Sequence, residues 1–123
     1  MSDPRDKKFR QLAAIHQHGC CHYCGCPMWS DDPALFAQQH RLSMREVAWF
    51  QCTAEHLIAR RDGGTSSRNN IAAACRYCNL HRHQRKASPS AEQYRAMVRN
   101  RIARSRWYPY HVHERFQLAL SAN

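Results

Sequence analysis

The sequence predicts a small α+β fold in which two short strands lie between helices. Three observations predict it. Apolar residues recur at helical spacing over residues 5–18, which predicts an N-terminal helix. Residues 49–58 and 71–74 have the apolar character of strands, and a long polar loop joins them. Two Cys-x-x-Cys pairs, at 21–24 and 75–78, enclose this region.

Turn and capping signals predict the remaining elements. Residues 34–47 predict two short helices that meet around Leu42-Ser43, and the spacing over 78–86 suits a further helix. Ser90 and Gln93 have the spacing of a capping box, which predicts that a last helix begins there. The apolar stripe of that helix consists of Tyr94, Met97, Val98 and Ile102.

These elements predict a single domain over residues 1–123. Its core spans residues 19–86, the helix at 5–18 precedes the core, and a basic helix and tail at 89–123 follow it. A domain of this size buries too little apolar surface to be secure by burial alone. A further source of stability is therefore expected.

Seven cysteines offer that stability. The first eight residues lack the apolar run of a secretory signal, so we expect a cytoplasmic, reducing setting in which disulfides do not persist. The paired thiolates then favour a structural Zn²⁺, because four of them satisfy a tetrahedral ion. The expected zinc ligands are Cys21, Cys24, Cys75 and Cys78. Cys20 and Cys26 flank the first pair, and either could replace one of its two ligands. Cys52 is expected to be buried as a small apolar residue.

The positive charge of the chain is concentrated in its second half. The formal net charge is +10, and between residues 76 and 106 nine cations stand against the single anion Glu92. Because phosphate contacts supply most non-specific affinity for nucleic acid, DNA is the expected partner, with RNA as an alternative. The expected contacts are Arg60, Arg61, Arg82, Arg85, Lys86, Arg95 and Arg99. No apolar stretch approaches the roughly 20 residues that span a bilayer, which excludes a transmembrane protein and a membrane partner.

A second cluster of polar residues predicts a divalent cation. Asn79 and His83 lie four residues apart, so on a helix they share one face. Glu55 completes the expected set. Oxygen and imidazole ligands with water in the other positions suit Mg²⁺, with Mn²⁺ or Ni²⁺ as alternatives, better than a closed zinc cage.

His56 is the candidate general base, since a neutral imidazole is suited to taking a proton from water near neutral pH. Neighbours on a regular strand point to opposite faces, so Glu55 and His56 reach one site only if the strand ends or bulges there. The following loop then needs an anchor. A side chain that bonds to backbone groups across the loop would hold His56 in place, and Asn70 is preferred to Asn69 for this.

Taken together, residues 19–86 resemble the HNH endonucleases of the zinc-ribbon type. The matching pieces are Cys-x-x-Cys-Gly at 21–25, Glu55-His56, the Gly63-Gly64 loop, Asn70 followed by an aliphatic residue, and Cys-x-x-Cys-Asn at 75–79. The resemblance implies the ββα-metal fold, also called the His-Me finger, with a treble-clef-like core flanked by the N- and C-terminal helices.

The resemblance also implies metal-dependent hydrolysis of phosphodiester bonds that leaves 5′ phosphates. His56 would activate the attacking water, and Glu55, Asn79 and His83 would hold the catalytic ion. The letters of the family name fall on His56, Asn70 and His83. The family more often has Asp before the histidine and Lys where this chain has Arg82; His81 and Arg82 compete with His83, which is preferred for its helical spacing.

Two other classes of function are alternatives to a nuclease. A non-catalytic zinc module that binds nucleic acid would use the same basic helices, but it has no reason to combine the five polar residues of the expected site. Thiol exchange at Cys-x-x-Cys is disfavoured, because two separated pairs are typical of metal binding. For a nuclease, cutting both strands with one small centre requires a homodimer or two successive nicks.

Overall fold

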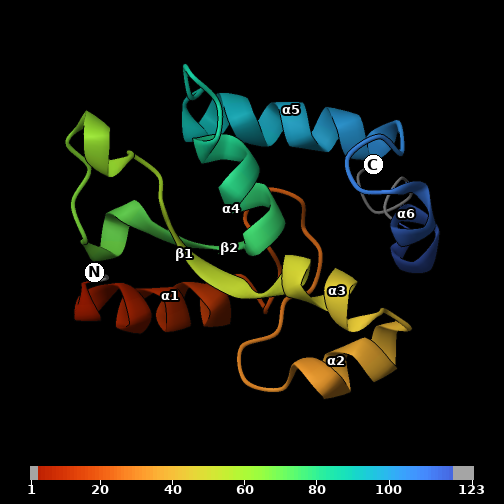
Figure 1. Cartoon of the computed structure of the whole chain (residues 1–123). Coiled ribbons are helices and arrows are strands. Elements are labelled where there is room, and N and C mark those ends of the chain that lie inside the picture. Colours follow the sequence, from red (N-terminus) through yellow and green to blue (C-terminus); the bar gives the residue numbers. More distant parts are fainter. Residues whose placement is uncertain (1–2, 118–123) are drawn as a thin grey trace.

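The computed structural model describes residues 3–117, so the outermost residues of the predicted domain lie outside the described part of the chain (Figure 1). The strands are β1, Cys52–His56, and β2, Ile71–Cys75. The helices are α1 (Pro4–His16), α2 (Pro33–His40), α3 (Met44–Val47), α4 (Arg76–His83), α5 (Ala91–Ala103) and α6 (Tyr110–Phe116). Short 3₁₀ turns occupy Ala48–Phe50, Arg60–Asp62 and Arg68–Asn70. The α+β class predicted from the sequence is confirmed.

The two strands form an antiparallel hairpin in which Cys52 pairs with Cys75 and His56 pairs with Ile71. β1 is shorter than residues 49–58, because a 3₁₀ turn precedes it and the chain leaves the sheet after His56. Every residue of β2 is buried. Its central residues are alanines, and their small side chains let elements pack closely on both faces.

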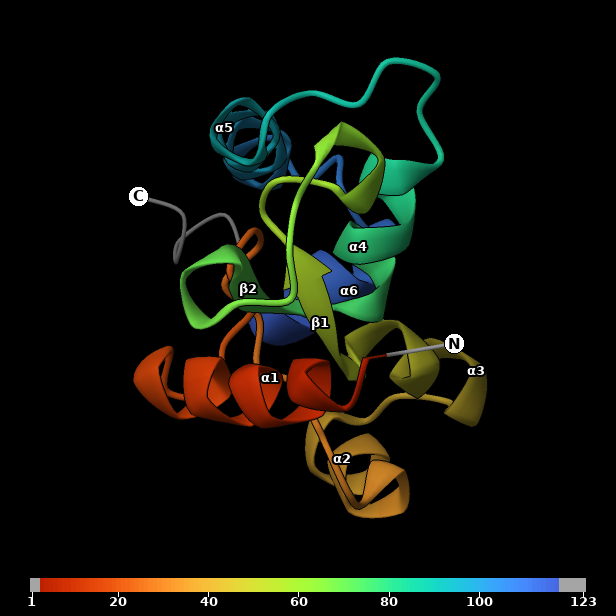
Figure 2. The ribbon, with the colours of Figure 1, turned by 90° about the vertical axis from the view of Figure 1, so that its left-hand side faces the viewer.

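The hairpin lies between two helices. α1 packs against both strands on one face and α4 packs against them on the other (Figure 2). Asp3 caps α1 by accepting a hydrogen bond from the amide of Arg5, and Pro4 occupies the first helical turn, where its missing N–H is not needed. α4 begins directly at the end of β2, so the turn between them places side chains of the sheet beside those of the helix.

The two short helices predicted within 34–47 are α2 and α3. Asp32 caps α2 through the amide of Leu35, and Ser43 with Glu46 forms a capping box at α3. These helices bring Phe36, Leu42 and Val47 into the buried core. They serve as a packing insertion between the first cysteine pair and β1.

The last long helix, α5, begins with the predicted capping box of Ser90 and Gln93. Tyr94, Val98 and Ile102 of its apolar stripe are buried. The Tyr94 hydroxyl donates to the backbone oxygen of Cys78 at 2.6 Å, which ties α5 to α4. α6 was not predicted, because its sequence has only a weak apolar pattern. Within residues 3–117 no helix is long and apolar enough to cross a membrane.

Candidate functional site

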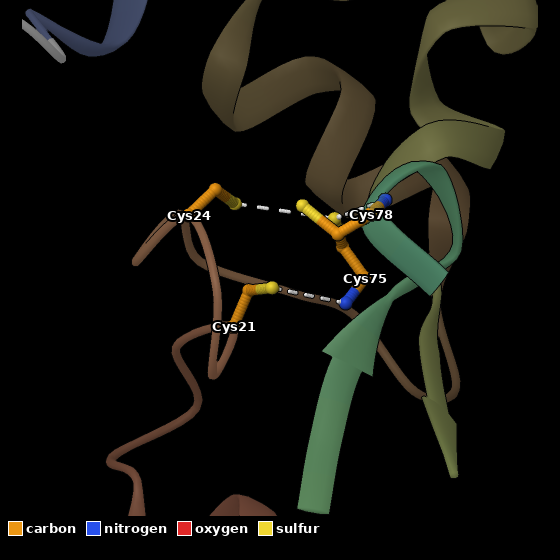
Figure 3. Close-up of side chains that lie close together, drawn as sticks. All are labelled: Cys21, Cys24, Cys75 and Cys78. Atoms are coloured by element: carbon orange, nitrogen blue, oxygen red, sulfur yellow. Dashed lines mark hydrogen bonds between the residues drawn. The ribbon is translucent and has the colours of Figure 1, made fainter. Parts of the chain in front are cut away.

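The four cysteines predicted to bind zinc converge, with all four Sγ atoms within 4.8 Å of one another (Figure 3). Two come from the loop after α1, one from the end of β2 and one from the first turn of α4. The Sγ atoms of Cys24 and Cys75 are 3.9 Å apart. A tetrahedral zinc with Zn–S bonds of about 2.3 Å requires about 3.8 Å between its sulfurs. The cluster therefore fits a structural Zn²⁺.

Surrounding donors hydrogen bond to the sulfurs of this cluster. The amide of Cys75 donates to Sγ of Cys21 at 3.3 Å, and the amide of Cys78 donates to Sγ of Cys75 at 3.4 Å. The Tyr108 hydroxyl lies 3.2 Å from the Sγ atoms of both Cys24 and Cys75. Such donors favour the thiolate form that metal binding requires.

The remaining cysteines lie outside the cluster. Cys26 is buried, and its amide donates to Sγ of Cys24 at 3.4 Å, so it supports the site through its backbone. Cys20 is half-buried, with Sγ 3.7 Å from the oxygen of His18. Cys52 is buried, as predicted. The sulfurs of Cys21 and Cys24, and not those of their neighbours, converge with the sulfurs of Cys75 and Cys78, which supports the preference for this pair.

Glu55 is the most heavily bonded acidic side chain near the hairpin. Although only 1 % of it is exposed, Oε1 accepts from His83 at 2.8 Å and Oε2 accepts from the Tyr23 hydroxyl at 2.7 Å. Oε2 also accepts from Arg82 at 3.0 Å. Burial by itself would raise the pKa of Glu55, but these hydrogen bonds outweigh it and the pKa is lowered. Glu55 is therefore a carboxylate at neutral pH.

The other two predicted ligands of a catalytic ion lie beside Glu55. Asn79 donates through Nδ2 to Oγ1 of Thr53 at 3.0 Å and to the oxygen of Ala54 at 3.2 Å. No hydrogen bond within residues 3–117 uses Oδ1 of Asn79, so this oxygen remains available as a ligand. His83 contacts Glu55, whereas Nδ1 of the competing His81 lies 2.7 Å from the oxygen of Tyr77 and its ring stacks on Tyr77.

These side chains share a cavity of about 300 Å³ with His56. Its lining consists of Ala54, Glu55, His56, Ala59, Arg60, Arg61, Asn79 and His83. Glu55 and His56 are the last two residues of β1, and both line this cavity. Two oxygen donors and one imidazole fit a hard divalent cation with water in its other positions.

This cavity brings fewer metal-ligating side chains together than the cysteine cluster does. Within residues 3–117, only the four cysteines bring three or more His, Cys, Asp or Glu ligand atoms together. Glu55 and His83 bond to each other directly, and Arg82 already neutralises part of the carboxylate charge. An ion in the cavity would have to insert between Glu55 and His83.

His56 is half-buried, and its hydrogen bonds involve Nε2. Nε2 lies 3.3 Å from Oγ of Ser66 and 3.2 Å from Nε of Arg60. Burial lowers the pKa of His56 below the usual 6.5; Asp6 raises it and Arg60 lowers it further. The imidazole is therefore mainly neutral at pH 7 and able to accept a proton.

Asn70 spans the loop that follows β1. Its Oδ1 accepts from the amide of Ile58 at 2.8 Å, and its Nδ2 donates to the oxygens of Ile58 and Thr65 at 3.1 and 2.9 Å. These bonds to the backbone are the ones expected of a loop anchor, and Asn69 is exposed. Gly64 is equally constrained: a Cβ on it would lie 1.6 Å from the oxygen of Ile58.

The cations predicted to contact nucleic acid fall into three groups. Arg60, Arg61, Lys86 and Arg95 are exposed. Arg85 and Arg99 are half-buried, and Nε of Arg99 donates to the oxygen of Tyr23 at 2.5 Å. The prediction that Arg82 contacts nucleic acid is wrong, because only 2 % of this residue is exposed. Its guanidinium donates instead to Glu55 and to the backbone oxygens of His56 and Leu57.

Two contributors to the site were missed from the sequence. Tyr23 lies between the ligands of the first cysteine pair, and only the zinc cluster brings it to Glu55, 32 residues away. Asp6 lies in the first turn of α1, and its Oδ2 accepts from Nη2 of Arg60 at 2.6 Å. An acidic residue in a first turn is ordinary, so no local signal marks Asp6.

Comparisons with known proteins identify the central segment. A family model described as HNH endonuclease matches residues 44–85. The match includes β1, the loop, β2 and α4, and with them every residue predicted to be catalytic. It leaves out α1 and the first cysteine pair. No curated protein and no solved structure matched the chain.

Removal of the cysteine ligands should unfold the protein. Structural zinc contributes about 10–16 kcal/mol of apparent free energy in small domains, as much as their whole stability. Elemental analysis should find one zinc per chain, and Cys75→Ser should lose both the zinc and the folded circular dichroism spectrum. Cys20→Ser is the matched control and should keep both. A folded Cys75→Ser protein without zinc would contradict the role of the cluster.

The two neighbouring glycines should respond differently to alanine. Gly63 has a φ of +90° and open space around it, so Gly63→Ala should cost roughly 1–2 kcal/mol from backbone strain. Gly64→Ala must move the backbone of Ile58, and we expect a loss of about 3 kcal/mol or more. Urea unfolding of both variants measures the difference. Equal losses would show that the loop adapts without strain.

Proposed function

We propose that the protein is a metal-dependent endonuclease that hydrolyses phosphodiester bonds in DNA, from the premise that residues 44–85 match a family model described as HNH endonuclease. The family match supports a nuclease-type function in general. The substrate, the catalytic ion and the roles of individual residues are the further content of the proposal.

One observation carries the proposal: a neutral histidine, a carboxylate and an amide oxygen line the same cavity of about 300 Å³, and two arginines stand at it. A module that only binds nucleic acid needs the arginines alone. A hydrolase needs in addition a base near the scissile bond and ligands for an ion. In this proposal His56 is the base and Glu55 and Asn79 are among the ligands, and all three lie within the segment that matches the family model.

In the proposed reaction His56 takes one proton from a water molecule as the water oxygen bonds to phosphorus. The bond between phosphorus and the 3′ oxygen then breaks, the 3′ oxygen takes a proton from solvent water, and the products are a 5′ phosphate and a 3′ hydroxyl. Asn70 contributes by holding the loop, so that His56 keeps one position through the reaction. Arg60 and Arg61 are placed to bind the phosphates beside the scissile bond.

A divalent cation held by Glu55, Asn79 and His83 would supply positive charge at the phosphate and at the departing oxygen. Glu55 is suited to this role because its pKa is lowered and it is ionised at neutral pH. Arg82 and Tyr23 hold the carboxylate in one orientation through Oε2, which leaves Oε1 on the side of His83.

DNA is proposed as the substrate because exposed cations at and beyond the cavity would contact its phosphates. The cavity lining includes Arg60 and Arg61. Lys86 follows the end of α4, and Arg95 adds an exposed positive charge on α5. These contacts recognise a backbone and carry no base sequence. RNA would satisfy them as well and is a comparison for the test.

Loss of the base should abolish cleavage without loss of binding. Zinc-loaded protein should nick supercoiled plasmid when Mg²⁺, Mn²⁺ or Ni²⁺ is added, and His56→Ala should reduce the rate about 10²–10⁴-fold, the usual contribution of a general base. His16→Ala removes an exposed imidazole at the end of α1 and should cut at the wild-type rate. Zinc content and circular dichroism verify the fold of each variant.

Binding without cutting by wild-type protein, on DNA and on RNA and with each ion, would contradict the proposal and favour the nucleic-acid-binding module. Equal nicking by wild type and His56→Ala would contradict the role of His56 alone.

The pH dependence should follow the neutral form of His56. The pKa of His56 is lowered below 6.5, mainly by burial, and the unprotonated imidazole is the active species. The nicking rate should therefore fall to half of its maximum at a pH below about 6.5, as the imidazole becomes protonated. Initial rates in buffers of equal ionic strength measure this. A half-maximal nicking rate well above pH 6.5 would show that the loss of activity at low pH is due to the protonation of another group.

A further inference from the structure

Asp6 is a buried acidic residue outside the segment that matches the nuclease family. It lies in the first turn of α1, and only 8 % of its side chain is exposed. Acidic side chains are seldom buried unless their oxygens have partners. Oδ2 has one, since it accepts from Nη2 of Arg60 at 2.6 Å, but Oδ1 is buried and has no hydrogen-bond partner in the described residues.

The unpaired oxygen faces the proposed base. Oδ1 of Asp6 lies 3.8 Å from Nε2 of His56, about 1 Å longer than a normal N–H···O hydrogen bond. Both residues line a cavity of about 710 Å³ between α1 and β1, which also includes Arg60. The hairpin thus brings a carboxylate from one end of the chain to the imidazole, 50 positions later.

A purely structural reason for Asp6 is insufficient. An acidic residue in a first turn stabilises a helix through the macrodipole by about 0.3–1 kcal/mol, and it does so from an exposed position. Asp3 already caps α1. Neither effect requires a buried carboxylate with one oxygen unpaired, whose desolvation works against the fold.

The neighbours of Nε2 favour opposite tautomers of His56. Arg60 has only donors, so its contact at 3.2 Å requires a lone pair on Nε2 and moves the ring proton to Nδ1. Asp6 has only acceptors, so it favours a proton on Nε2. In that second tautomer the lone pair of Nδ1 is free, and no hydrogen bond within residues 3–117 occupies it.

We propose that Asp6 is a positioning residue that holds His56 in the catalytic tautomer. When Arg60 moves from Nε2 to a substrate phosphate, Oδ1 of Asp6 accepts the N–H of Nε2. Nδ1 is then the atom that takes the proton from water. Arg60 has a side chain that is 51 % exposed, so it is able to make this move. The inference rests on the proposed function, yet the tautomer is measurable without any cleavage.

Asp6→Asn is a sharp test because Arg60 sets the direction of the new amide. The donor on Arg60 requires the amide oxygen on its side, so the amide nitrogen faces Nε2 and donates to it. An acceptor is thereby replaced by a donor at nearly constant shape. Asp3→Asn removes the same charge three residues earlier, on the same cavity, and keeps an effective helix cap, which makes it the matched control.

The first readout is the tautomer itself. In zinc-loaded protein labelled with ¹⁵N-histidine, two-dimensional spectra identify which ring nitrogen carries the proton, and His56→Gln assigns the signal. Arg60→Gln removes the competing donor and should populate the Nε2–H tautomer without DNA. Adding Asp6→Ala to it removes the acceptor and should abolish the preference for Nε2–H. Asp3→Asn should leave the tautomer of the wild-type protein unchanged.

The second readout is the rate of plasmid nicking. Asp6→Asn should lower kcat about 10- to 100-fold with KM changed less than about twofold, since orientation of a base is a fraction of its full contribution. Asp6→Glu keeps an acceptor and should recover at least part of the loss. Asp6→Ala should lower kcat as well, and adding Arg60→Gln to Asp6→Ala should not restore it, because the acceptor is still missing.

The outcomes separate the two ideas. An Nε2–H tautomer that persists when Asp6→Ala is added to Arg60→Gln overturns the positioning role, whether or not the protein cuts DNA. The predicted tautomer in a protein that cuts nothing supports the positioning of His56 and contradicts the nuclease. Restored kcat in the double variant would show that Asp6 only draws Arg60 away from His56, and it too would overturn the proposal.

Discussion

The zinc cluster is the constraint on which the rest of the structure depends. It joins the loop after α1 to the end of β2 and the start of α4, segments separated by more than fifty residues. Aromatic side chains from α4, α5 and the loop before α6 pack around it, and Tyr108 hydrogen bonds to its sulfurs. Without this junction the two strands of the hairpin would lack a fixed relation to the first loop, and Tyr23 would not reach Glu55.

The cluster also links stability to chemistry. The carboxylate of Glu55 is buried, and an isolated charge there would be strongly unfavourable. Tyr23 comes from the zinc loop, Arg82 and His83 come from α4, and together they hold Glu55 ionised. The hydrogen bonds that stabilise the buried charge of Glu55 are therefore also the ones that keep this proposed cation ligand ionised. This coupling explains why Arg82 is used inside the protein although its surroundings in the sequence are those of a basic surface.

His56 depends on a different set of supports. Asn70 closes the loop from one side through three bonds to backbone groups, and the close approach of Gly64 to Ile58 permits that closure only without a side chain. On the other side α1 brings Asp6 against Arg60 and the imidazole. The hairpin is thin, so residues from both of its faces meet at the point where β1 ends. The proposed site at the end of β1 thus includes contacts from α1, a helix outside the segment that matches the family model.

The sequence by itself determined the elements and the chemistry whose signals are local. Cysteine spacing indicated the expected zinc ligands, and the capping box of Ser90 and Gln93 indicated where α5 begins. The order Glu55, His56, Asn70, Asn79 indicated a family whose model matches residues 44–85. The tertiary structure decided what depends on distant contacts. Arg82 and an exposed arginine are alike in sequence, and only the packing of α4 on the hairpin buries one of them. Asp6 and Tyr23 carry no local signal, because their partners lie 54 and 32 residues away and are reached only when the zinc cluster and α1 close on the sheet.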